Sequence, residues 1–415
     1  MSRSWDVVVA GHICLDFIPD LSQSRANSVG ALLRPGQLIE VGAATLSTGG
    51  AVSNTGLALH KLGMRTRLMG KIGDDLLGRV VRQIIDTHGP GLADGMVVDA
   101  SADTSYTVII NPPGIDRMFL HAPAANNAFG AADVGYEAVA QARLFHFGYP
   151  PLVRRMFVDG GAELVAMFRR VRELGVTTSL DMALPDPASD AGHAGWNRIL
   201  AAVMPYVDVF LPSIEELLFM LRRPRYDALL RQAAAGSLLS LVTGDLLTDL
   251  SDELIALGGC IVGIKLGDRG FYLRTAHKER LLAMGAGAPA EPKDWADREL
   301  WAPCFDVRLV GTTGAGDAAI AGFLAGVLRG LSANETLRMA VAVGACNVEA
   351  ADALGGIRPW QETEARVAQG WSQHRMSEPS PSWRYDAHYG MWEKPSGSCN
   401  AEERSDRWSG AGAVA

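Results

Sequence analysis

The amino-acid sequence predicts an α/β protein with one central, mainly parallel sheet flanked by helices, together with a small accessory sheet. Short β-branched segments alternate with longer segments of helical period, which is typical of parallel strands joined by crossover helices. In the first third of the chain the rhythm differs. There, extended segments bounded by Pro, Gly and Asn follow one another without room for helices between some of them. These segments predict a second, smaller sheet that could serve as a lid.

The expected elements follow in chain order. Strands of the central sheet are predicted at 7–9, 177–180, 207–211 and 261–266, and helices at 56–62, 76–85, 162–174, 214–221 and 335–348. Strands of the accessory sheet are predicted at 14–21, 38–46, 105–111 and 117–121.

Composition excludes several classes of protein. A chain of 415 residues that is 48% hydrophobic and 20% charged is expected to be globular with a full core. Its 38 basic and 46 acidic residues give a net charge of −8, which opposes attraction to nucleic acid or to an anionic bilayer, so neither partner is expected.

A cytoplasmic location is expected. The longest apolar runs, such as 318–328, are shorter than the roughly 20 residues of a bilayer span. Asp6 and Asp16 interrupt the N-terminus where a signal peptide needs an apolar core. The five cysteines are far apart and odd in number, so we expect reduced thiols rather than a disulfide framework or a thiolate zinc site.

Residues 1–376 are expected to form one domain, with lid strands drawn from about 12–46 and 104–122. Residues 276–303, which include GAGAPAEPKDW, predict a long polar loop, and an insertion is favoured over a functional cover. Residues 377–415 are rich in Ser, Pro, Gly and charge, which predicts a poorly ordered tail without chemistry.

The segment GTTGAGDAAIAGFLAGVLRG, 311–330, carries the strongest chemical signal. Apolar residues recur at helical spacing after the glycines, so Gly314 to Asp317 are expected in the first turn of a helix, with Thr313 as its cap. Free amides at such a helix start attract an anion. The segment also fits the dinucleotide pattern G-x-G-x-x-A, but no strand ending in an acidic ribose ligand follows it, and a purely structural helix start is the simpler alternative.

Further motifs accompany it in a fixed order. They are Gly49-Gly50 with Asn54, Gly70, Gly73, Asp75 and Gly78, Ala125-Asn126, Pro212-Ser213-Ile214-Glu215-Glu216, Lys265 to Gly270, and Thr312 to Asp317. This combination resembles the ribokinase-like carbohydrate kinases, the PfkB family, over residues 7–360. The resemblance implies one doubly wound α/β domain with a β-sheet lid over the substrate.

The resemblance also implies an activity, the ATP-dependent phosphorylation of a hydroxyl group on a small sugar or polyol with Mg²⁺. In such kinases the acid after the Gly-Ala-Gly turn is the catalytic base, which takes the proton of the attacking hydroxyl. Asp317 is therefore the implied base. The amides of Gly314, Ala315 and Gly316 would hold the charge on the transferred group.

Other roles follow from matching positions. Asp16, Gly49, Gly50, Asn54 and Asn126 resemble sugar-binding residues. Thr313, Lys265, Gly267, Gly270 and Asn347 resemble nucleotide-binding residues, and Glu216 resembles the glutamate that orders water and Mg²⁺. Lid edges in this family can pair between subunits, so a homodimer is compatible with the sequence.

The sequence departs from the family pattern at several positions. Gly311 stands where an aspartate usually helps to hold an activating monovalent cation, which leaves potassium dependence open. Ser213 replaces the asparagine of N-x-x-E, while Ala183 and Pro185 replace the Asn and basic residue often found near Asp181. Two alternatives stay open, a nucleoside kinase of the same fold and a non-catalytic sugar- or nucleotide-binding protein derived from a kinase.

Overall fold

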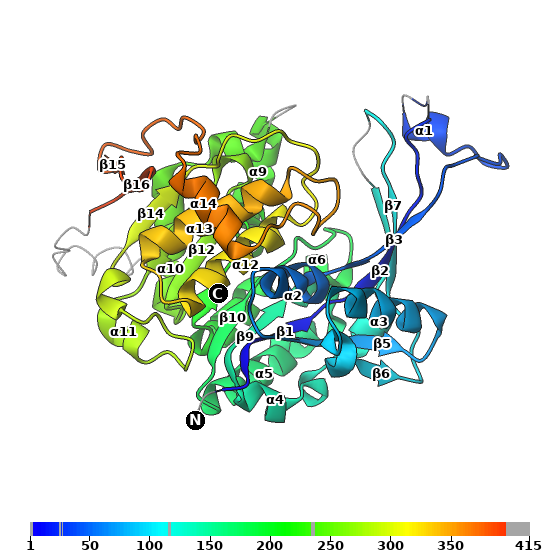
Figure 1. Cartoon of the computed structure of the whole chain (residues 1–415), viewed down its shortest axis with the longest axis horizontal. Coiled ribbons are helices and arrows are strands. Elements are labelled where there is room, and N and C mark those ends of the chain that lie inside the picture. Colours follow the sequence, from blue (N-terminus) through cyan, green and yellow to red (C-terminus); the bar gives the residue numbers. More distant parts are fainter. Residues whose placement is uncertain (1–2, 25, 27, 115–117, 234–236, 396–415) are drawn as a thin grey trace, which may run out of the picture.

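The computed structural model describes residues 3–24, 26, 28–114, 118–233 and 237–395. Its largest element is a ten-stranded sheet with the order β15-β16-β14-β13-β12-β11-β10-β9-β1-β4 (Figure 1). The strands from β4 to β12 in this order pair in parallel, and those from β12 to β15 pair antiparallel. The bounds are β1 Trp5–Gly11, β4 Thr66–Met69, β9 Ala142–Gly148, β10 Thr177–Leu180, β11 Val209–Phe210, β12 Ile261–Lys265, β13 Phe271–Thr275, β14 Glu299–Ala302, β15 Arg384–Asp386 and β16 Met391–Glu393.

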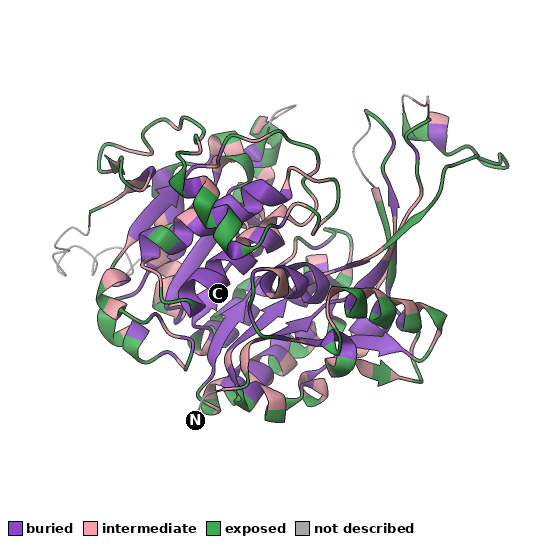
Figure 2. Ribbon diagram, viewed as in Figure 1, coloured by how far each residue is buried: buried purple, intermediate pink, exposed green. Residues whose placement is uncertain are grey.

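Both faces of this sheet are covered, which confirms the predicted fold class. Side chains of a strand alternate between faces, and Val7 and Val9 of β1 belong to one hydrophobic cluster while Val8 and Ala10 belong to another. Figure 2 shows the central strands as the buried interior between two helical layers. One layer contains α2 Ala51–Lys61, α3 Leu76–His88, α12 Ala315–Leu328, α13 Ala333–Asn347 and α14 Trp360–Ala368, and the other contains α4 Tyr136–Ala140, α5 Ala162–Glu173, α7 Trp196–Val203, α8 Ile214–Leu221 and α10 Gly244–Leu257.

The accessory sheet is present as four strands in the order β3-β2-β7-β8, and it projects from the body of the molecule (Figure 1). We call it the lid. Its strands are β2 Cys14–Ile18, β3 Thr45–Gly49, β7 Tyr106–Ile110 and β8 Met118–Ala122.

Several predicted lid boundaries are wrong. Strand β2 ends at Ile18 and not at residue 21. Strand β3 begins at Thr45, because it pairs with β2 and β2 ends at Ile18, which is the partner of Thr45. Residues 38–44 therefore have no partner strand and stay exposed, and β3 continues beyond the predicted end to Gly49. Arg117, placed in the last lid strand by the sequence, lies outside the described residues.

Short elements complete the fold. Strands β5 Lys71–Gly73 and β6 Val97–Asp99 form a separate two-stranded sheet. The remaining helices are α1 Val29–Leu32, α6 Asp190–His193, α9 Arg223–Ala233 and α11 Lys278–Leu282.

The segment 276–303 is only partly a loop. It contains α11 and ends in β14, which joins β13 in the main sheet. Trp295 is fully buried, and its indole Nε1 donates to the Leu331 carbonyl at 3.0 Å. The buried side chains of Leu300, Trp301 and Ala302 on β14, together with Trp295, explain why this segment packs against the body instead of extending from it.

The expectation of a poorly ordered tail is wrong for residues 377–395. This stretch forms the β15–β16 hairpin, which extends the main sheet at β14. Trp383 is buried, with ring centroids 6.2 Å from Tyr272 and 6.4 Å from Trp301. The polar composition gave no sign of this hairpin, because Trp383 and Met391 are the only buried hydrophobic residues between 377 and 395. Residues 396–415 lie outside the described part of the chain.

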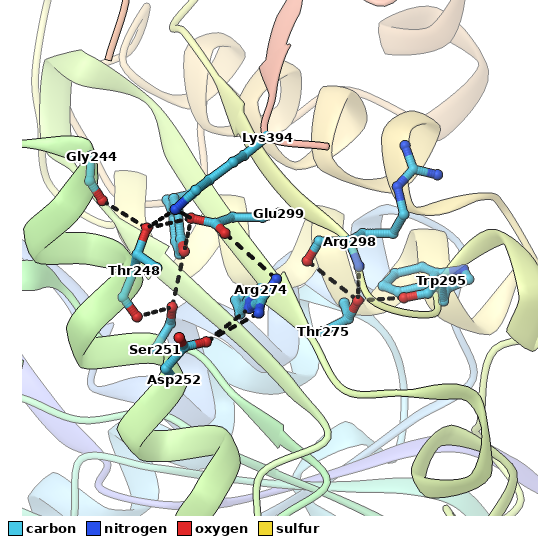
Figure 3. A network of polar contacts seen from close by, with 11 residues as sticks. Gly244, Thr248, Ser251, Asp252, Arg274, Thr275, Trp295, Arg298, Glu299 and Lys394 are labelled. Carbon is cyan, nitrogen blue, oxygen red and sulfur yellow. Dashed lines mark hydrogen bonds and ion pairs between the residues drawn. The ribbon is translucent and has the colours of Figure 1, made fainter. Parts of the chain in front are cut away.

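A buried polar network holds the hairpin in place (Figure 3). Glu299 on β14 accepts a hydrogen bond from Thr248 Oγ1 at 2.5 Å, and its carboxylate lies 3.5 Å from Arg274 and 3.6 Å from Lys394. Lys394 Nζ also donates to Thr248 Oγ1 at 3.0 Å. Because Lys394 follows β16 directly, this network ties the end of the hairpin to α10 and β14.

Candidate active site

The start of α12 has the geometry of an anion site. Gly314 is the N-cap, with φ 71° and ψ 4°, and a Cβ there would lie 2.7 Å from Ala353. This left-handed conformation suits glycine. The predicted cap, Thr313, is therefore wrong, because the chain turns at Gly314 and no side chain caps this helix. The Ala315 amide donates to the Thr312 carbonyl at 3.3 Å, and the amides of the first turn lack intrahelical acceptors.

Asp317 lies in this first turn and is buried. Its carboxylate accepts hydrogen bonds from Asn54 Nδ2 at 3.1 Å and Thr55 Oγ1 at 3.1 Å, both on α2. The hydroxyl of Tyr149, just after β9, lies 2.7 and 2.8 Å from its two oxygens. Asp317 is thus held by neutral donors from two distant segments. Sequence patterns did not identify Thr55 or Tyr149, although Tyr149 follows the carboxyl end of a central strand, where ligands of α/β sheets gather.

Lys265, at the end of β12, reaches the same region. Its Nζ lies 2.6 Å from Asp181 Oδ1, and Asp181 is fully buried. Burial alone would lower the pKa of Lys265, but Asp181, Glu216 and Asp317 together raise it. Burial raises the pKa of Asp181 to about 8, Lys265 opposes this rise, and Glu216 and Asp317 reinforce it. One lysine therefore stands among three carboxyl groups.

Glu216 has a structural role in addition to its predicted one. Its Oε2 accepts the Ser213 backbone amide at 2.6 Å, while Ser213 Oγ accepts the Glu216 amide at 3.2 Å. This is a capping box at the start of α8. Ser213, which departs from the family pattern, can fill the cap because serine is among the preferred N-cap residues.

A cavity of about 700 Å³ lies along these groups, within the size range of small-molecule sites. It brings together many of the predicted catalytic, nucleotide-binding and metal-binding residues. Its lining includes Tyr149, Glu216, Lys265, Gly267, Gly270, Thr312, Gly314, Ala315, Gly316, Asp317, Gly344 and Ala345.

Two predicted nucleotide-binding residues, Thr313 and Asn347, lie outside that lining. Asn347 is fully buried, and its Nδ2 donates to the Thr313 carbonyl at 2.9 Å. This contact holds the turn before α12. Gly344 and Ala345, one turn earlier on α13, face the cavity instead.

The predicted sugar-binding residues Asp16, Gly49 and Gly50 lie where the lid meets the start of α2. A Cβ at Gly49 would clash with the Asp16 carboxylate, and one at Gly50, where φ is 86°, would clash with His12. These glycines therefore let the junction of β3 and α2 lie against Asp16 and His12. Burial raises the pKa of Asp16 to about 6, opposed by hydrogen bonds from Cys14 and Thr107.

Asn126 differs from the other predicted sugar-binding residues. It is fully buried, its Oδ1 accepts the Ile13 amide at 3.2 Å and its Nδ2 donates to the Ile13 carbonyl at 2.8 Å. The side chain thus fixes the chain between β1 and β2.

Gly311 lies against backbone carbonyls. A Cβ there would lie 2.9 Å from the Ala350 oxygen and 3.0 Å from the Ala351 oxygen. An aspartate at this position would need the neighbouring backbone to shift.

The doubly wound sheet, the lid and the cavity at the start of α12 define a sugar-kinase type of phosphotransferase. The model of the pfkB family carbohydrate kinases matches residues 5–358, and the chain belongs to this family. Fructokinase-2 of Oryza sativa subsp. japonica is 26% identical over 334 residues, which cover 78% of this chain and 80% of the rice protein.

Solved structures share the fold. Ribokinase from Arabidopsis thaliana, complexed with ribose and ATP, superposes with a TM-score of 0.63 at 18% identity, covering 88% of this chain and 98% of that one. A nucleoside kinase from Methanocaldococcus jannaschii gives a TM-score of 0.60 at 15% identity, covering 89% of this chain and 100% of that one.

Within the described residues, we find no helix with the length and apolar character needed to cross a membrane.

Proposed function

We propose that this sugar kinase transfers the γ-phosphoryl group of ATP to a hydroxyl of a small sugar or polyol, with Asp317 as catalytic base. The observation that carries the proposal is the position of Asp317. Its carboxylate is in the first turn of α12, lines the cavity, and is held by donors from α2 and the end of β9. A group held in this way can take a proton without first reorganising.

The neighbouring groups have complementary roles. The first-turn amides of α12 would bind the transferred phosphoryl group, because their N–H groups and the helix dipole favour negative charge. Lys265 lies close enough to the turn that a Cβ at Gly316 would be 3.4 Å from its Cδ. Its positive charge would thus act beside the same phosphates.

The residues also fit Mg²⁺. The buried Asp181 Oδ2 has no hydrogen-bond partner among the described residues, and Glu216 lines the cavity nearby. Oxygen atoms are the ligands that Mg²⁺ prefers in proteins. When bound, Mg²⁺ would offset the negative charge of the phosphates.

The sugar is proposed to lie between Asp317 and Asp16. A carboxylate such as Asp16 can accept two hydrogen bonds from neighbouring hydroxyls. Asn54 donates to Asp317, so its proposed contact with the sugar would use the amide oxygen, which has no partner within the described residues. The ribose in the Arabidopsis ribokinase complex and the fructokinase relatives support a sugar as the substrate. Similarity to the archaeal nucleoside kinase makes a nucleoside the alternative substrate.

A homodimer is proposed through the lid. Leu46 of β3 and Phe119 and Leu120 of β8 are large apolar residues exposed on the lid. Apolar side chains on a projecting sheet favour pairing with a second copy. Sedimentation of the wild type and of Phe119→Lys tests this, and a monomeric wild type would contradict it.

The test of function measures ADP release from Mg-ATP with pentoses, hexoses, ketoses, sugar acids and nucleosides. The wild type is compared with Asp317→Asn and with Asp245→Asn, which changes an exposed first-turn acid of α10. We expect one sugar class to turn over, with kcat reduced at least ~10²-fold only in Asp317→Asn. An active Asp317→Asn would refute the base. The absence of turnover, while a sugar still raises the melting temperature, would favour a binding protein.

A further inference from the structure

Three side chains with metal-ligand atoms meet where the lid joins the main sheet. His12 follows β1, Cys14 begins β2 and His121 lies on β8. One nitrogen of each histidine and the Cys14 Sγ all lie within 4.8 Å of one another. His12 and Cys14 are buried and His121 is exposed, so the cluster has one open side. None of the three lines the cavity of the candidate active site.

Strand pairing places Cys14 and His121 on one face of the lid, and His12 lies in the connection between β1 and β2. Cys14 and Asp16 are two residues apart on β2 and therefore point to the same side. Thr107 on β7 is the partner of Asp16 and also of His121 on β8. The lid register thus fixes the positions of Cys14 and His121 relative to each other.

The two imidazoles already have the separation that a shared ion requires. His12 Nε2 and His121 Nε2 are 3.3 Å apart. Two nitrogens bound to one tetrahedral ion at about 2.0–2.1 Å would be ~3.3 Å apart.

Neighbouring groups can orient the ligands. Thr107 Oγ1 lies 3.0 Å from His121 Nδ1 and 3.5 Å from Cys14 Sγ. If His121 Nδ1–H donates to Thr107 and Thr107 O–H donates to sulfur, His121 Nε2 presents its lone pair toward His12. Such outer contacts are typical of histidine ligands. Burial and the charge of Asp16 raise the pKa of the Cys14 thiol well above its usual value, so a bound ion would have to displace the thiol proton.

We propose that His12, Cys14 and His121 bind one Zn²⁺-like divalent ion. Thiolate and imidazole ligands select zinc and similar borderline or soft ions over Mg²⁺, so this site differs from the proposed magnesium site. The Cys14 thiol donates to Asp16 Oδ1 at 3.3 Å. Binding forms the metal–sulfur bond, breaks the S–H bond and passes that proton through the Asp16 carboxylate to water.

Three protein ligands leave a fourth position open. Asp16 is the proposed sugar ligand beside Cys14, so an ion here would occupy space intended for the sugar. This expectation rests on the proposed function. Zn²⁺ should inhibit turnover in competition with the sugar, and Mg-ATP should not relieve the inhibition.

The direct test titrates Co²⁺ into the full-length, reduced protein without sugar or nucleotide. We expect one equivalent to bind with thiolate-to-cobalt absorption in the near ultraviolet. Cys14→Ser should abolish this band and His121→Asn should weaken binding at least ~10-fold, because each removes one of three ligands. Matched controls are Cys304→Ser and His193→Asn, which change a thiol and an exposed histidine outside the cluster.

Several outcomes would overturn the inference. They are no thiolate–cobalt band in the wild type, an unchanged band in Cys14→Ser, and equal loss in Cys304→Ser. If Cys14→Ser fails to fold, the exposed His121→Asn carries the test with the melting temperature as the folding check. Co²⁺ binding does not depend on turnover, so a protein without kinase activity could still confirm the metal site. Turnover without cobalt binding would refute the metal site and leave the proposed function intact.

Discussion

The Tyr149 hydroxyl lies 2.7 and 2.8 Å from the two carboxylate oxygens of Asp317 and joins the end of β9 to the start of α12. Burial and the charge of Asp317 raise the pKa of Tyr149 well above its usual value, so the phenol stays a donor. Tyr149 is therefore a positioning residue for the proposed base.

We expect Tyr149→Phe to lower kcat about 10- to 100-fold, because a hydrogen bond to a charged group contributes about 1.5–3 kcal/mol. Steady-state kinetics with the sugar found in the panel measures this. Tyr385→Phe, which changes an exposed tyrosine on β15, should leave kcat unchanged. Wild-type kcat in Tyr149→Phe would show that Asn54 and Thr55 suffice to hold Asp317.

Asp16→Ala should raise KM for the sugar strongly and change KM for ATP little, since Asp16 lies on lid strand β2 and away from the cavity lining. The matched control is Asp20→Ala, which changes an exposed acid two residues after the end of β2. Unchanged sugar binding in Asp16→Ala, measured by calorimetry, would remove Asp16 from the substrate site.

Activity should be the same in potassium and in choline chloride. Gly311 offers no carboxylate, and the space beside it is bounded by the Ala350 and Ala351 carbonyls. Initial rates at constant ionic strength test this. Stimulation by potassium would mean that backbone oxygens alone hold the ion.

His146 should make the protein less stable in acid. Burial, with Lys265 reinforcing it, lowers the pKa of His146 to about 3 in the folded chain. The unfolded histidine titrates near 6.5, so between these values only the unfolded state binds the proton, and stability falls as pH falls.

Urea unfolding at pH 7, 6 and 5 tests this prediction. The free energy of unfolding of the wild type, relative to His146→Gln, should fall by about 1.4 kcal/mol per pH unit below 6.5. His193→Gln, an exposed histidine, should follow the wild type. A constant difference across this pH range would show that His146 does not couple to stability.

A chain ending at residue 376 should melt at a lower temperature than one ending at 395. The shorter chain loses the β15–β16 hairpin and the buried Trp383, and removing a buried tryptophan side chain alone costs about 3–5 kcal/mol. It also leaves Glu299 without Lys394. Equal melting temperatures for the two chains would mean that the hairpin contributes nothing to stability.

The sequence by itself determined the fold class and the main chemical motif. The alternation of β-branched and helical segments depends on local side-chain period, which survives in a single sequence. The GAGD turn could also be recognised, because the left-handed conformation at Gly314 favours glycine. The order and spacing of the other motifs then indicated the family.

Only the tertiary structure decided how distant groups meet. Tyr149 and Asp317 are 168 residues apart, and no periodic pattern links them. His12, Cys14 and His121 come together through strand pairing across the lid, although the cysteines had been assigned no metal role. Burial likewise decided that Asn126 and Asn347 bind backbone carbonyls, and that Trp383 anchors a hairpin in a polar segment. Contacts of this kind depend on which surfaces become adjacent after folding, and local sequence does not encode that adjacency.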